Sequence, residues 1–167
     1  GGNPIASKWY TSGSAGQYIF HAYGDGSGNG YLKFWIHSGS SFTTLTTSDT
    51  VLTEDNWYHV SATYNGSTMR IYVDGQIVAE KTTTIDELSQ TEYTSDNLYL
   101  GSLRTLSSWT FKGTLDEVKI SYRTEEMTKP RYIESYRDVE ENQVLNLHLD
   151  QSSGTTATDS TGYNTAT

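Results

Sequence analysis

The chain of 167 residues has no cysteine, two prolines and four phenylalanines. The absence of cysteine excludes a disulfide framework and a thiol nucleophile, and it leaves the cellular compartment open, because many exported microbial domains also lack cysteine. No apolar run approaches the roughly 18 residues that a membrane helix needs, so we expect no membrane insertion.

The chain also has few basic residues. Lysine and arginine number 11 against 20 acidic residues, and the formal net charge is -9. Nucleic-acid binding requires a basic footprint that neutralises phosphates, so we expect no nucleic-acid partner. An acidic surface remains compatible with cations.

Threonine, serine, tyrosine and tryptophan take up much of the sequence, with 13 tyrosines and four tryptophans. This composition suits half-buried strands better than helices. Short segments with period-two alternation are separated by glycine, asparagine, aspartate and serine clusters, which predicts an all-β chain. The predicted strands span residues 17–23, 31–37, 57–64, 69–73, 76–79, 97–100, 114–122 and 144–149.

Two dipeptides predict tight hairpins. Asp74-Gly75 joins 69–73 to 76–79, and a type I′ turn needs positive φ at both central residues. Asn65-Gly66 predicts the same kind of reversal one strand earlier, so residues 57–79 form a predicted three-stranded meander. One short helix is predicted over 128–138, where Thr128 can cap and Pro130 fits a first turn. Together these elements predict an antiparallel two-sheet jelly-roll sandwich with one short helix near the C-terminal part.

Three stretches carry a family resemblance. They are Asn56-Trp57-Tyr58-His59-Val60 running on to the Asp74-Gly75 hairpin, residues 97–101 followed by Phe111-Lys112-Gly113-Thr114-Leu115-Asp116-Glu117-Val118-Lys119-Ile120, and Ile5-Ala6-Ser7-Lys8-Trp9. In this order and spacing the chain resembles the laminin-G-like jelly rolls of the concanavalin A-like lectin/glucanase superfamily. Residues 1–141 would be such a domain without its first strand.

Residues 142–167 resemble the family's first strand and the loop after it, although they lie at the C-terminus here. Two interpretations follow. The segment opens a tandem second copy, which we favour, or it returns as a strand to its own domain in cis or to a neighbour in trans. A sheet without an inner strand would expose unpaired backbone groups that something must cover.

The alternation from Leu115 onward predicts that Asp116 falls on an apolar face. A buried carboxylate must either accept several backbone hydrogen bonds or bind a cation. The resemblance implies a structural calcium ion between the loop after the first strand and the closing strand, with Asp116, Asp159, Asn164 and the Gly162 carbonyl as ligands. These oxygen ligands are the kind that calcium takes.

Several aromatic residues cannot all be core. We expect most of them to fill or rim the sandwich, and the alternative is that some form a ligand-binding surface with polar neighbours. These candidates are Trp9, Tyr10, Trp35, Tyr93 and Trp109. The four histidines lie on separate predicted strands, so they do not indicate a zinc site.

No catalytic arrangement is predicted. A glucanase of this superfamily needs two carboxylates on one face of a strand, whereas Glu54-Asp55, Asp86-Glu87 and Asp116-Glu117 are adjacent residues that point to opposite faces. The resemblance therefore implies a non-catalytic extracellular or cell-surface module, microbial or viral, that binds a glycan or an extracellular protein. The alternative is an architectural module of a fibre, filament or virion, assembled with neighbouring copies of itself by strand complementation.

Overall fold

A computed structural model of the chain describes residues 2–10, 15–38, 41–85, 88, 97–103, 109–121, 143–147, 157–158 and 165–166. The chain divides into two compact units. The first comprises Gly1–Lys112 and Glu126–Pro130, and the second comprises Gly113–Glu125 and Arg131–Thr167.

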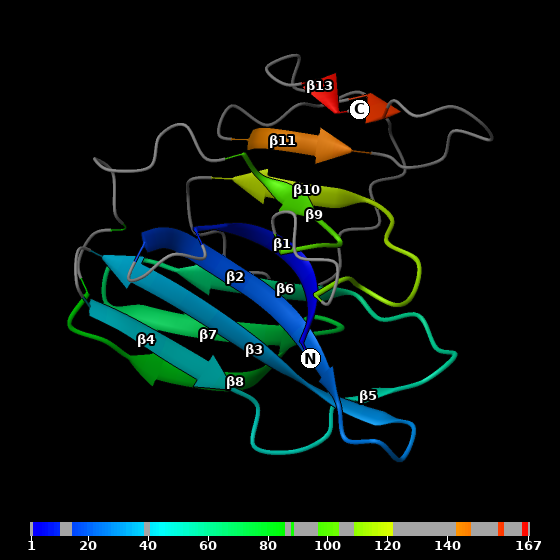
Figure 1. Cartoon of the computed structure of the whole chain (residues 1–167). Coiled ribbons are helices and arrows are strands. Elements are labelled where there is room, and N and C mark those ends of the chain that lie inside the picture. The colour runs from blue at the N-terminus through cyan, green and yellow to red at the C-terminus, as the bar shows by residue number, and fades with distance from the viewer. Residues whose placement is uncertain are drawn as a thin grey trace. The chain divides into compact units, whose positions relative to one another are not determined.

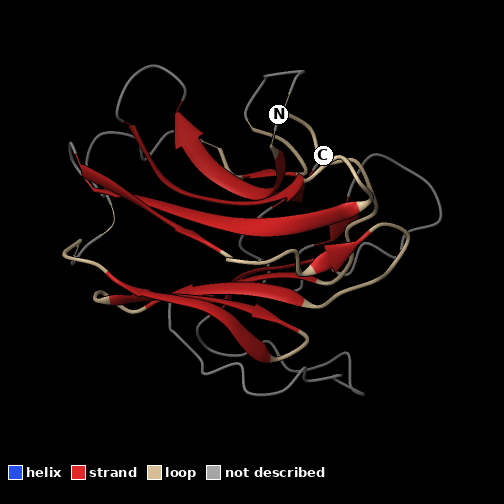
Figure 2. Ribbon diagram, turned by 90° about the horizontal axis from the view of Figure 1, so that it is seen from below, coloured by secondary structure: helices blue, strands red, loops and turns tan. Residues whose placement is uncertain are grey.

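The first unit contains two antiparallel sheets that face each other as layers (Figures 1 and 2). The larger sheet has the strand order β4-β3-β2-β1-β9. The short strand β5 pairs with the N-terminal end of β3, on the same edge as β4. The smaller sheet has the order β6-β7-β8. The strands of the larger sheet are β1 (Asn3–Tyr10), β2 (Ala15–Gly24), β3 (Asn29–Ser38), β4 (Ser41–Thr46), β5 (Leu52–Thr53) and β9 (Tyr99–Leu100). Those of the smaller sheet are β6 (Val60–Tyr64), β7 (Thr68–Val73) and β8 (Gln76–Thr82).

The core lies between these two sheets. Successive side chains of a strand point to opposite faces, and the apolar ones on the facing sides of the two sheets pack together. In β3, Leu32, Phe34 and Ile36 are buried and join the core cluster. Met69 and Ile71 of β7 meet them from the other sheet, each fully buried. The remaining buried members of the cluster are Phe20, Leu45 and Ile85. The predicted all-β, two-sheet jelly-roll sandwich is thereby confirmed.

The predicted meander and its second hairpin are also confirmed. Asp74 and Gly75 have φ values of 50° and 78°, as a type I′ turn requires. The Asp74 carboxylate also accepts a hydrogen bond of 2.9 Å from the His59 backbone N–H. The reversal at Asn65 is confirmed, but its predicted turn type is wrong, since only Gly66 has positive φ there. The Asn65 side chain accepts hydrogen bonds from the backbone N–H groups of Ser67 and Thr68, which stabilises a longer turn instead.

Three strands of the larger sheet, β1, β4 and β5, have no counterpart among the predicted ones, although β1 contains the family-like stretch 5–9. β4 has the sequence Ser-Phe-Thr-Thr-Leu-Thr, in which Leu45 is the only side chain that reaches the core cluster. Its threonines gave no apolar alternation, although threonine suits a strand well. The predicted strand 57–64 begins only at Val60, and Trp57 is 70% exposed.

The second unit contains two short strand pairs. β10 (Val118–Ser121) pairs antiparallel with β11 (Gln143–Leu147), with Val118 opposite Leu147. Leu147 is buried. β12 (Ala157–Thr158) pairs with β13 (Thr165–Ala166). The helix predicted over 128–138 lies outside the described residues, and no helix in the described part of the chain could cross a bilayer.

Candidate binding site on the outer face of the larger sheet

The face of the larger sheet that points away from the core carries aromatic side chains. The residues of β2 and β3 that alternate with the core positions stand opposite one another in the register. The pairs are Ile19 with Trp35, His21 with Lys33, and Tyr23 with Tyr31. Directly paired residues project to the same face of a sheet, so these six side chains share the outer face.

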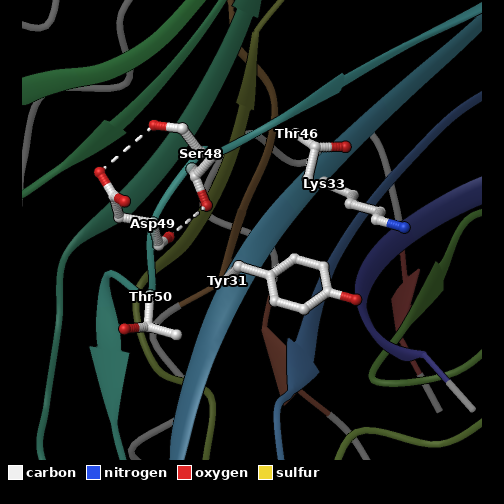
Figure 3. A pocket seen from close by; sticks show the side chains of 7 residues that line it. Tyr31, Lys33, Thr46, Ser48, Asp49 and Thr50 are labelled. Carbon is white, nitrogen blue, oxygen red and sulfur yellow. Dashed lines mark hydrogen bonds between the residues drawn. The ribbon is translucent and has the colours of Figure 1, made fainter.

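A pocket of about 330 Å³ opens beside Tyr31 and Lys33 (Figure 3). Its other walls come from the end of β4 and the loop that follows. Tyr31 and Lys33 lie side by side on β3 and point the same way. The full lining is Tyr31, Lys33, Thr46, Thr47, Ser48, Asp49 and Thr50.

Thr47 fixes the pocket loop to β3. Its hydroxyl accepts a hydrogen bond of 3.2 Å from the Leu32 N–H and donates one of 3.0 Å to the Asp49 carbonyl. The Thr47 N–H also donates to the Leu32 carbonyl at 3.0 Å. Because Thr47 is buried, these bonds are shielded from water and hold the start of the loop against the edge of β3.

The aromatic wall of the pocket is reinforced by a second tyrosine. The rings of Tyr23 and Tyr31 stack nearly parallel, with centroids 5.4 Å apart and an interplanar angle of 5°. The Lys33 ammonium lies 4.6 Å from the Tyr23 centroid and 5.4 Å from that of Tyr31. Both distances are within the range of a cation–π interaction. Partial burial, with a smaller contribution from Tyr31, raises the pKa of Tyr23, so its phenol stays neutral near pH 7.

The part of the lining that comes from the loop after β4 is polar and open to solvent. Ser48, Asp49 and Thr50 are exposed, and the Ser48 hydroxyl donates to the Asp49 carboxylate at 3.3 Å. Lys33 makes no ion pair within the described residues, so its ammonium can still donate to a ligand. The pocket therefore offers one aromatic face, one cation, one carboxylate and several hydroxyl groups.

Three of the predicted ligand-binding aromatics gather on the same outer face. Trp9 meets Trp35 edge-to-face with centroids 6.0 Å apart, and Trp109 stacks on His21 at 6.2 Å. All three tryptophans are half-buried, so they form a packed cluster beside the pocket rather than a bare platform. Tyr10 is the last residue of β1, and Tyr93 lies outside the described residues. Their roles in ligand binding remain predictions.

Two histidines of this cluster are buried without hydrogen bonds to any described residue. His21 and His37 are 0% and 1% exposed, and neither ring nitrogen of either residue has a partner in the part of the chain that the structure describes. Burial, and secondarily the positive charge of Lys33, lowers the pKa of His21 to about 4. His21 is therefore neutral near pH 7. Its surroundings are aromatic, with Tyr23 at 4.6 Å and Trp35 at 5.4 Å between ring centroids.

The prediction that Asp116 falls on an apolar face is wrong. Asp116 precedes β10, which begins at Val118, and it is exposed rather than held on an apolar face. The reason is that Glu117 has a φ of 50°, which breaks the extended alternation before Val118. The Asp116 carboxylate accepts a 2.9 Å hydrogen bond from the Glu117 N–H.

The calcium site is not tested by this geometry. Asp159, Gly162 and Asn164 lie outside the described residues, so Asp116 alone of the four predicted ligands can be placed. No group of three or more histidine, aspartate or glutamate side chains in the described part of the chain could hold a metal ion. Calcium binding stays a prediction.

The sequence reasoning missed Tyr23, Tyr31 and Lys33, and it missed the pocket loop 46–50. The signal was present in β3, where Tyr31, Lys33 and Trp35 alternate with the core residues. Alternation alone identifies an outer face, but it does not distinguish an outer face that is covered from one that is open.

The chain matches a known family and is similar to several solved structures. A protein from Bacteroides ovatus named a "putative carbohydrate binding protein" has 26% identity and a TM-score of 0.70, and the match covers 99% of this chain and 47% of that one. This chain thus spans about half the length of that protein. An S-layer domain-containing protein from Clostridium thermocellum has 22% identity and a TM-score of 0.37, covering 77% of this chain and 62% of its own. No curated protein matches the chain. The profile of the concanavalin A-like lectin/glucanases superfamily matches residues 2–128, and the chain therefore belongs to that superfamily.

Proposed function

We propose that this domain is a binding module that recognises a glycan, without catalysis, through the pocket beside Tyr31. The observation that carries the proposal is the composition of the pocket, in which the Tyr31 ring, stacked on Tyr23, and the Lys33 ammonium line the same hollow as a loop of exposed hydroxyls. The family membership and the name of the Bacteroides ovatus protein support the same ligand class.

A sugar ring has the two properties that the pocket would complement. Its C–H groups form an apolar face that can pack on the Tyr31 ring, and its hydroxyls both donate and accept hydrogen bonds. The Lys33 ammonium, which points the same way as the Tyr31 ring, can donate to a hydroxyl of this sugar (Figure 3). A bond that involves this charged group is stronger than one between neutral groups, so it would orient the ring.

Binding without turnover fits the number of acids at the pocket. Glycoside hydrolysis uses two carboxyl groups, roughly 5–5.5 Å apart for retention or 6.5–9.5 Å for inversion. Asp49 is the one acid in the described lining of this pocket. We therefore expect no hydrolysis of a bound glycan, which can be checked by chromatography of an oligosaccharide after prolonged incubation with the protein.

The proposal is tested on a glycan array followed by calorimetric titration of the best soluble hit. We expect Tyr31→Ala to weaken binding about tenfold or more, because about 1.4 kcal/mol of lost contact free energy corresponds to a factor of ten. Trp57→Ala is the matched control, since Trp57 is a 70% exposed aromatic outside the pocket. An array without any hit, or equal losses in the two variants, would contradict the proposal.

We also propose that residues 142–167 return to their own chain and that the module acts at the cell surface or outside the cell. The pairing of β11 with β10 supports the first part. Light scattering coupled to size exclusion should then give a monomer mass at all concentrations. A dimer or polymer that becomes monomeric when residues 142–167 are deleted would instead favour strand exchange between copies.

A further inference from the structure

We propose that the binding site extends beyond the pocket, along β3 and β4 as far as Phe42, and that it takes a stretch of a linear polysaccharide rather than a single terminal sugar. This inference rests on the proposed function and adds the length of the ligand to it. It is carried by an exposed aromatic residue that the pocket alone does not explain.

Phe42 lies on β4 with 65% of its surface exposed. The ring packs on Trp35, with centroids 6.4 Å apart and planes tilted by 30°. A large exposed apolar side chain that is held in place by a half-buried neighbour presents a fixed contact surface. Its position on the outer face of the sheet follows from its direct pairing with His37.

The strand register gives the length of the strip. His37 stands opposite Phe42 and is six residues beyond Tyr31 on β3. At about 3.3 Å per residue, Tyr31 and Phe42 lie roughly 20 Å apart along the strand direction. One sugar ring cannot touch both, so a ligand that uses both contacts must be a chain of several rings.

The positions between the two ends continue the same chemistry. Lys33 pairs with Thr46 and Trp35 pairs with Thr44 across β3 and β4, so aromatic, ammonium and hydroxyl groups follow one another on the outer face. A polysaccharide repeats apolar ring faces and hydroxyls in the same way. A peptide that adds a strand to the sheet would need free backbone groups on the edge strand β4. The Thr44 carbonyl on that strand already accepts a hydrogen bond of 3.1 Å from the Lys81 ammonium of β8, so we favour a polysaccharide.

The experiment measures how affinity depends on ligand length in the wild type and in a variant of Phe42, the residue at the far end of the strip. Cello-oligosaccharides, manno-oligosaccharides and galacturonate oligomers of one to six sugars are titrated into the wild type, Phe42→Ala and Ile77→Ala. Ile77 is the control because it is 55% exposed and lies on β8 of the other sheet. For at least one of these three oligosaccharide series, the ladders, we expect the affinity of the wild type to rise about tenfold or more from the shortest oligomer that binds to the hexamer.

The expected result is that Phe42→Ala loses this rise and keeps the affinity for the shortest oligomer, while Ile77→Ala behaves as the wild type. An affinity that does not depend on length, or a rise that Phe42→Ala leaves unchanged, would overturn the inference and leave the proposed function standing. Absence of binding by every ladder would count against both. A loss of self-association in Phe42→Ala, seen by light scattering, would assign the strip to a second copy of the chain and overturn the inference as well.

Discussion

The buried histidine at the centre of the outer face gives a quantitative prediction for stability against pH. His21 has a folded-state pKa of about 4, against 6.5 for the free side chain. Its charged form is disfavoured because the ring is buried among Tyr23, Trp35 and Trp109 and lies near the Lys33 ammonium. The unfolded chain has no such penalty and takes up the proton more readily as the pH falls.

The sign and size follow from proton linkage. Above pH 6.5 both states are neutral at His21, and below that value the unfolded state alone binds a proton until the pH approaches 4. With these two pKa values the free energy of unfolding should fall by about 2 kcal/mol between pH 7 and pH 5 from this residue. For a chain of this size that corresponds to a decrease of roughly 4–8 °C in melting temperature.

The assay is urea denaturation followed by tryptophan fluorescence at pH 7, 6 and 5, for the wild type, His21→Phe and the control His59→Gln. His21→Phe keeps an aromatic ring and removes the titrating group, so it should lack the 2 kcal/mol loss. At pH 7 it should be at least as stable as the wild type, because two buried nitrogens that have no hydrogen-bond partner among the described residues are removed. His59 is exposed, so its variant should follow the wild type. Parallel losses in wild type and His21→Phe would refute the reasoning.

Three further predictions concern the turn, the pocket loop and the metal. Gly75→Ala should lower the free energy of unfolding by roughly 1–2 kcal/mol in urea denaturation, because Gly75 has a φ of 78°, and an unchanged midpoint would contradict the type I′ turn. Thr47→Val should cost about 1–3 kcal/mol because the buried Leu32 N–H loses its acceptor, and it should weaken glycan binding through the displaced loop; calorimetry that shows full affinity would argue against the loop's role. Calcium should raise the melting temperature in differential scanning fluorimetry and Asp116→Ala should reduce that rise, whereas no shift on adding or chelating calcium would remove the predicted site.

The architecture of the first unit could be predicted because the local sequence of most of its strands shows which side chains face the core. In β3, Leu32, Phe34 and Ile36 alternate as buried apolar residues, as do Met69 and Ile71 in β7, and the Asp74-Gly75 turn sets the register of β7 and β8. β4 could not be found this way, since a Thr-rich strand with one core residue has the composition of a loop. Its place next to β3 depends on backbone pairing that any sequence can make.

The candidate site was predictable only in part. Trp9, Trp35 and Trp109 do gather on one face. Trp35 and Trp109 pack on His21 and Trp9 packs on Trp35 and His37, which leaves the open surface to Tyr31 and Lys33. The alternation that identified Asp116 as buried failed because Glu117 departs from extended backbone. A single residue of positive φ cancels a period-two argument on its N-terminal side, and composition does not reveal it.

The sequence by itself determined the all-β class, the meander with its hairpins and the superfamily, because these depend on alternation, turn residues and motif order along the chain. Only the tertiary structure decided which aromatics are packed and which are open, and that the loop after β4 lies beside β3 and lines a pocket with Tyr31 and Lys33. Those properties arise from side chains far apart in the sequence, such as Leu32 and Thr47, whose contacts follow from strand pairing rather than from local propensity.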